Sequence, residues 1–201
     1  LWLRADLGVT IAGAGVDTWA DQSGSGDANR NARQTTDALR PQQTTSANYA
    51  GRSIITTATG TTYLATGTWG TSYAQPTTIY CCGYLSGTGR IYDGSTAGNR
   101  QALLAQTAHQ SYYAGSTVVE GTIASTTRAV TCAIYNGASS ALYVSNSQTA
   151  EANGNPGAHN LDVLGILNTA DGAAGTGGTE VAEIIAYTGS HDAATRLRVM
   201  Q

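Results

Sequence analysis

The fold is constrained most by a series of short β-prone runs in the central part of the chain, each ended by Gly, Asn or Ser. The runs are about five to eight residues long, the usual length of a strand, and their end residues are those of tight turns. The low charged fraction of 11% and the 25 glycines also favour strands and turns over long surface helices. The runs are PTTIYCCGYLSG, GRIYDG, QALLAQ, QSYYAGSTVVEGT, RAVTCAIYNG and SALYVSN. This pattern predicts an all-β sandwich.

Residues 129–146 contain the clearest hairpin in the series. Asn136 and Gly137 between its two runs readily adopt positive φ, as hairpin turns require. A glycine within a later β-prone run, Gly165, predicts a bulge or a close approach of another backbone segment. Further strands are expected at residues 52–57, 61–65, 161–168 and 180–187.

The two ends of the chain are expected to meet in one sheet. Residues 1–6 resemble a rim strand and are predicted to pair with the closing strand at 180–187. After that strand, Ser190 is the predicted N-cap of a short helix, and Asp192 in its first turn favours the helix dipole. Apolar residues at helical spacing give this helix one face to pack against the sandwich; they are Ala193, Ala194, Leu197 and Met200.

The stretch VDTWADQSGSG near the start carries the most specific motif, formed by Trp19, Asp21, Ser23, Gly24 and Gly26. The Asp21 carboxylate is placed to accept amide hydrogen bonds from the Ser-Gly turn that follows it.

Together with Arg40-Pro41 and the closing run EVAEIIAYTGSHDAATRLRVMQ, this motif resembles the laminin-G-like, concanavalin A-like jelly-roll domains of phage structural proteins and bacterial exoproteins. The resemblance implies a sandwich of two antiparallel sheets, about twelve strands in all, with a short C-terminal helix. Residues 1–201 fit a single domain of this size. The polar stretch at 27–50 is expected to be a surface loop.

Composition makes several partners poor candidates. Lysine is absent and the net charge is −3, so the chain has no broad basic field for nucleic acid. Its apolar stretches are shorter than the roughly 18 residues of a membrane-inserted helix, and the start has no basic segment followed by an apolar one, as a secretory leader would have. Because Leu1 begins a strand-like segment and Gln201 ends a helix-like one, we expect this chain to be part of a longer polypeptide.

The three cysteines do not have the spacing of a zinc site. Cys81 and Cys82 are adjacent, without the two intervening residues that let two thiolates bind one zinc ion. On a strand they point to opposite faces, so at most one of them is placed to form a disulfide with Cys132. Small buried thiols are the alternative.

A calcium site is a second metal hypothesis. Asp17, Asp21 and Asp27 offer hard oxygen ligands at close spacing, as calcium requires. An Asx turn accounts for Asp21 without any metal, and the spacing is not that of an EF-hand.

Glycosidase activity requires two carboxylates that flank a cleft. The chain lacks the E-x-D-x-x-E pattern of jelly-roll glucanases, and its acids outside turns are scattered at Glu120, Glu151 and Glu183. Glu183 lies in an apolar strand, so we expect it to pair with an arginine such as Arg4 or Arg196.

A polysaccharide lyase is the second enzymatic alternative. The segment SYYAG resembles part of the motif of jelly-roll alginate lyases, with Tyr112 in the matching position but without the lysine. The histidines are interpreted as loop or cap residues, because no nucleophile or metal spacing connects them; they are His109, His159 and His191.

A non-catalytic sugar site needs an exposed aromatic ring for stacking and nearby polar groups for the hydroxyls. Such residues cluster along consecutive predicted strands and their turns: Arg90, Tyr92, Asp93, Asn99, Arg100, Tyr112 and Tyr113. They are the predicted ligand-binding residues.

The resemblance and this cluster together lead to a functional expectation. The domain is expected to be extracellular or on a virion surface and to recognise cell-surface glycans or polysaccharides, without catalysis and without a cofactor other than calcium. The alternative is a structural module that decorates or assembles a phage particle through protein contacts, including contacts with copies of itself.

Overall fold

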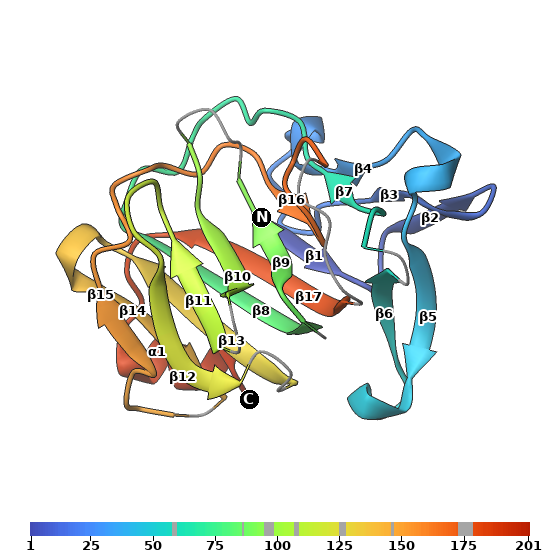
Figure 1. Cartoon of the computed structure of the whole chain (residues 1–201). Coiled ribbons are helices and arrows are strands. Elements are labelled where there is room, and N and C mark those ends of the chain that lie inside the picture. The colour runs from blue at the N-terminus through green and yellow to red at the C-terminus, as the bar shows by residue number, and fades with distance from the viewer. Residues whose placement is uncertain are drawn as a thin grey trace.

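In a computed structural model the chain forms two facing antiparallel sheets and one short α-helix (Figure 1). The structure describes residues 1–57, 60–85, 87–94, 99–106, 109–124, 128–145, 147–172 and 179–201. The prediction of an all-β sandwich with a C-terminal helix is confirmed. No helix among these residues is long and apolar enough to cross a membrane.

Within the described residues the first sheet, sheet A, has eight strands and contains the first and the last strand of the chain. The N-terminal strand β1 pairs antiparallel with the closing strand β17, with Leu3 opposite Ile184, so the predicted meeting of the two ends is confirmed. The strands of sheet A, in spatial order, are β15 (Ala152–Gly154), β14 (Ser140–Val144), β13 (Ala129–Tyr135), β8 (Thr77–Leu85), β17 (Thr179–Thr188), β6 (Arg52–Thr57) and β5 (Gln42–Ser46), with β1 (Trp2–Arg4) beside β17.

The second sheet, sheet B, has nine strands in the part of the chain that the structure describes. They are, in spatial order, β12 (Val119–Ala124), β11 (His109–Tyr113), β10 (Ala102–Gln106), β9 (Gly89–Asp93), β16 (Gly165–Ile166), β7 (Leu64–Ala65), β4 (Ala32–Arg33), β3 (Gly15–Trp19) and β2 (Val9–Ala12). The helical elements are η1 (Ala28–Arg30), η2 (Asp37–Leu39), η3 (Ala47–Tyr49), η4 (Gly137–Ser139) and α1 (Ala193–Val199).

Residues 27–50 are more ordered than the predicted surface loop. They contain strands β4 and β5 and three single-turn helices. The polar sequence of β5, QQTTS, conceals its strand character because most of its side chains are exposed, while its backbone pairs with β6 along its whole length. Pairing with a distant strand therefore outweighs the local composition.

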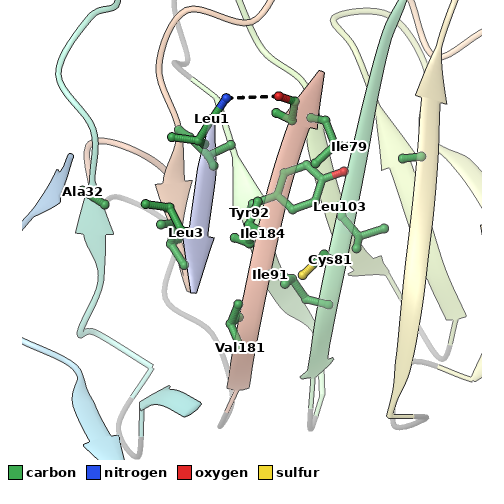
Figure 2. Packing of buried hydrophobic residues seen from close by; sticks show 14 of the residues in the cluster. Leu1, Leu3, Ala32, Ile79, Cys81, Ile91, Tyr92, Leu103, Val181 and Ile184 are labelled. Atoms are coloured by element: carbon green, nitrogen blue, oxygen red, sulfur yellow. Dashed lines mark hydrogen bonds between the residues drawn. The ribbon is translucent and has the colours of Figure 1, made fainter. Parts of the chain in front are cut away.

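The main core lies between the two sheets and is shown in Figure 2. Leu3 from β1 is fully buried there with Ile184 from β17 and Tyr92 from β9. The Leu1 amine donates to the Ala186 carbonyl at 3.1 Å, which extends the β1–β17 contact (Figure 2). Burial of these apolar side chains is the main contribution that holds the two layers together.

Two local predictions are confirmed. Strands β13 and β14 form the expected hairpin around Gly137, which has a φ of 51°. At Gly165 a Cβ atom would lie only 2.3 Å from the backbone nitrogen of Ala170, so this glycine permits the close approach that the sequence suggested.

The predicted helix cap is wrong by two residues. Helix α1 begins after Asp192, whose carboxylate accepts a hydrogen bond from the Thr195 amide at 2.8 Å. Ser190 therefore lies outside the helix, and Asp192 acts as the N-cap instead of a first-turn residue.

Helix α1 covers part of the outer face of sheet A, on the side away from sheet B (Figure 1). Met200, just after the helix, is buried in a second small apolar cluster with Tyr80, Cys132 and Ile134. Over the neighbouring part of the outer face, at β1 and β17, none of the residues that the structure describes forms a covering helix.

Candidate functional site

The register of four neighbouring strands in sheet A arranges outward-facing side chains in two rows. Strands β1, β17, β8 and β13 lie side by side, and residues opposite one another share a face. One row runs through Arg4, Glu183, Cys82 and Val130. The other row runs through Trp2, Ile185, Tyr80 and Cys132.

A groove of about 610 Å³ lies over this grid. Its volume is within the range of small-molecule sites. One wall is the turn between β5 and β6, where Tyr49 and Arg52 lie, and the opposite wall is the end of α1, where Val199 and Met200 lie. The groove therefore joins residues from both ends and the middle of the chain.

The β1 end of the groove is polar and aromatic. The Trp2 indole Nε1 donates to Glu183 Oε1 at 2.5 Å, which fixes the ring beside the carboxylate. The Arg4 guanidinium lies 5.6 Å from the Trp2 ring centroid and forms an ion pair with Asp6 at 2.8 Å. The expected pairing of Glu183 with Arg4 or Arg196 is wrong, because the indole and not a guanidinium satisfies its Oε1 atom.

The floor of the groove contains Cys82, which is half-buried and free. Burial and the nearby Glu183 carboxylate raise the pKa of the Cys82 thiol, and the Arg52 guanidinium opposes this shift. Cys81 and Cys132 are also free and are both buried. All three cysteines are therefore free thiols, as the second of the two predictions for them stated, and no disulfide joins Cys132 to Cys81 or Cys82.

This arrangement predicts selective modification of Cys82. In the native protein we expect a maleimide reagent to label one of the three cysteines, and more slowly than an exposed thiol because the thiolate form is disfavoured. Counting labelled sites by mass spectrometry before and after unfolding measures this. Cys82→Ser should remove the native-state label, and rapid labelling of two or three sites in the folded protein would contradict the arrangement.

Four of the seven predicted ligand-binding residues come together elsewhere, on sheet B. Asp93 is fully buried and accepts hydrogen bonds from Arg100 Nε and Nη2, both at 2.7 Å. Arg90 Nε donates to the same carboxylate, and the Arg100 guanidinium lies 4.9 Å from the Tyr113 ring centroid. The carboxylate thus holds two arginines in place, as a buried ion-pair network does.

The other predicted residues are elsewhere in the structure. Tyr92 and Tyr112 are fully buried in the core, so neither ring has a face for a sugar, which corrects the expectation for these two. Burial raises the pKa of Tyr112 to about 12, which also makes it a poor base for a lyase reaction. Asn99 donates to Asp162 Oδ2 at 2.6 Å.

The three proposed calcium ligands do not form a metal site. The Asp17 carboxylate binds Arg40 at 2.8 Å, while Asp27 caps η1 through the Asn29 amide at 3.0 Å. Among the residues the structure describes, no group of three or more His, Cys, Asp or Glu side chains is placed to hold a metal ion.

Asp21 instead forms the predicted Asx turn. Its Oδ1 atom accepts hydrogen bonds from the Ser23 amide at 3.0 Å and from the Trp2 amide at 2.8 Å. Burial alone would raise the pKa of Asp21, but these bonds and those from the Ser23 and Ser25 hydroxyls lower it overall. This carboxylate therefore connects the motif after β3 to the start of β1.

Sequence reasoning missed the groove, although part of its signal is in β17. In the run VAEIIAY, Glu183, Ile185 and Tyr187 alternate on one face, which identifies an outer face of mixed polarity. Nothing local to that strand indicates that Trp2 and Val130 lie beside it.

Comparison with known proteins defines the class of fold and no narrower group. No family model and no curated protein matches the chain. The solved structures that resemble it include Trypanosoma rangeli sialidase in complex with the inhibitor DANA, with a TM-score of 0.59 and 10% identity, and the same enzyme in complex with sialic acid, with a TM-score of 0.54 and 11% identity.

In both comparisons the match covers 99% of this chain and 32% of the sialidase chain. The chain thus spans about a third of the length of these enzymes. At this identity the likeness shows a shared β-sandwich fold.

Proposed function

We propose that this domain recognises carbohydrate without catalysis, and that the groove on the outer face of sheet A is its binding site. The observation that supports this most strongly is the grouping of a fixed indole ring with charged side chains in one groove of about 610 Å³. Trp2 offers apolar ring surface to the C–H face of a sugar, and Arg52 and Glu183 offer a donor and an acceptor for its hydroxyls.

The state of the two carboxylates in the groove favours binding over hydrolysis. Asp6 forms an ion pair with Arg4 at 2.8 Å, and Glu183 accepts the Trp2 N–H at 2.5 Å. Glycoside hydrolysis needs two carboxyl groups that flank the scissile bond, whereas each of these carboxylates is already bound to a protein side chain. Incubation with chromogenic glycosides should therefore release no chromophore.

The solved structures that share the fold are consistent with a carbohydrate ligand. They are described as sialidases in complex with sialic acid or with an inhibitor. Display of this domain on a virion or a secreted protein, and attachment to cell-surface glycans, are parts of the same proposal. A sialylated glycan belongs in the set of ligands to be tested.

The proposal predicts that Trp2→Ala weakens glycan binding at least about tenfold, since aromatic anchors contribute much of the binding energy in such sites. A glycan array with the soluble domain would identify ligands, and calorimetric titration would compare the variants. Tyr187→Ala is the matched control, because this exposed ring lies on the same face of β17 but does not line the groove. Circular dichroism would check that both variants fold. Absence of any glycan above background, or unchanged affinity of Trp2→Ala, would contradict the proposal.

A further inference from the structure

The groove changes character along its floor from one end to the other. Arg4 and Glu183 on β1 and β17 make one end polar. Val130 on β13 and Met200 after α1 make the other end aliphatic, and both belong to or pack on the small apolar cluster of the outer face. Cys82 lies between the two ends, directly opposite both Glu183 and Val130 in the register.

A sugar that carries only hydroxyl groups does not match this floor. Hydroxyls placed against Val130 and Met200 would lose water without gaining hydrogen-bond partners, which is unfavourable. A purely apolar ligand would in turn give no hydrogen-bond partner to Glu183 Oε2 or to the Arg52 guanidinium. A group that is polar on one side and ends in a methyl group would match both the polar and the aliphatic residues of the groove.

Resting on the proposed carbohydrate function, we propose that the groove recognises the acetamido group of an N-acetylated amino sugar. The amide N–H donates to Glu183, the amide carbonyl accepts from Arg52, and the methyl group packs against Val130 and Met200. Each of these features of the ligand has one counterpart on the floor or a wall of the groove.

The state of the protein groups supports this assignment. Trp2 occupies Glu183 Oε1, while Oε2 has no hydrogen-bond partner within the described part of the chain. Arg52 lines the groove near Cys82 and forms no ion pair with any described residue, whereas Arg4 is already bound to Asp6. One acceptor and one donor are therefore available near Cys82.

The dimensions of the floor also agree. Four adjacent strands span three inter-strand intervals, or roughly 14 Å. This length accommodates an acetamido group together with the sugar ring that carries it, which places the ring over Trp2. Tyr80, in the neighbouring row of the same face, is held by a hydrogen bond between its hydroxyl and His191 Nδ1 at 2.8 Å.

The experiment compares two pairs of sugars that differ at this group. The neutral pair is N-acetylglucosamine and glucose, and the acidic pair is N-acetylneuraminic acid and the deaminated sialic acid that has a hydroxyl in place of the acetamido group. Affinities of the methyl glycosides are measured by titration, and protection of Cys82 from maleimide reports occupancy of this groove. We expect the acetylated member of at least one pair to bind about tenfold more tightly, as one buried methyl group with satisfied polar neighbours can provide.

Val130→Thr keeps the volume of the side chain but places a hydroxyl at the aliphatic end. This variant should reduce the acetyl preference to about threefold or less, which is the loss of roughly one methyl contact. Val119→Thr is the matched control, because Val119 is also partly buried but lies on β12 in sheet B; it should keep the full preference.

The outcomes separate this inference from the function on which it rests. Binding of neither pair, nor of any glycan, would contradict carbohydrate recognition itself. Binding with equal affinity within both pairs, or a preference that Val130→Thr leaves unchanged, would overturn the acetamido assignment while the carbohydrate function stands. Preference in one pair alone identifies whether the acetamido sugar is neutral or acidic.

Discussion

Replacing Asp93 with Asn is expected to lower the free energy of unfolding by about 3 kcal/mol, measured by urea denaturation. The Asp93 carboxylate is 0% exposed and binds Arg90 and Arg100, whose side chains are 24% and 20% exposed. An amide has no charge and cannot accept both guanidinium groups. The substitution therefore leaves two partly buried cations without their counterion, a loss that is larger than the gain from forming the pair.

Asp6→Asn is the control for this effect. It breaks the Arg4–Asp6 ion pair, but both side chains are well exposed, at 35% and 49%. Solvent screens such a pair, and we expect a change below about 0.5 kcal/mol. A loss of less than 1 kcal/mol for Asp93→Asn would show that solvent reaches the network and that the buried carboxylate does not organise sheet B.

Leu3→Ala is expected to cost about 3 kcal/mol of stability, the usual loss for a large aliphatic side chain removed from a core. Leu3 is fully buried between the sheets, although it lies on a strand of only three residues (Figure 2). Within the described residues β1 pairs with β17 in sheet A, and Leu3 is the side chain of this strand that is fully buried in the core. Its loss should also expose the Trp2 end of the groove.

The matched control is Leu7→Ala, the same substitution four residues further along the chain. Leu7 is 46% exposed, and its truncation should change stability by less than about 0.5 kcal/mol. Thermal unfolding followed by circular dichroism would compare the two variants. Equal and small effects at both positions would mean that β1 contributes little to the sandwich, and would weaken the case for a groove built on it.

The sequence predicted those features whose cause is local. The β13–β14 hairpin follows from Asn136 and Gly137 and from the flanking β-prone runs. The Asx turn at Asp21 follows from the Ser-Gly segment after it. In the same way, the short C-terminal helix follows from apolar spacing, although its cap is at Asp192 and not at Ser190.

The predicted ligand-binding residues show that local sequence patterns do not determine which side chains are buried. Sequence proximity grouped Arg90, Asp93, Arg100 and Tyr113 correctly, and the structure brings them together. Sequence proximity does not show which tyrosine side chains face the core and which face solvent. The Tyr112 side chain is in the core, while that of its neighbour Tyr113 is not. Successive side chains on a strand point to opposite faces, so the burial of each tyrosine depends on which face of the strand packs against the other sheet.

From the sequence alone follow the all-β class and the tight turns, because β-propensity, turn chemistry and alternation act over a few residues. Only the tertiary structure decided that Trp2, Cys82, Val130 and Glu183 share one surface. Their proximity depends on the register between strands that are far apart in the chain. That register is set by how all the apolar side chains fill the space between the sheets together, and no single segment encodes it.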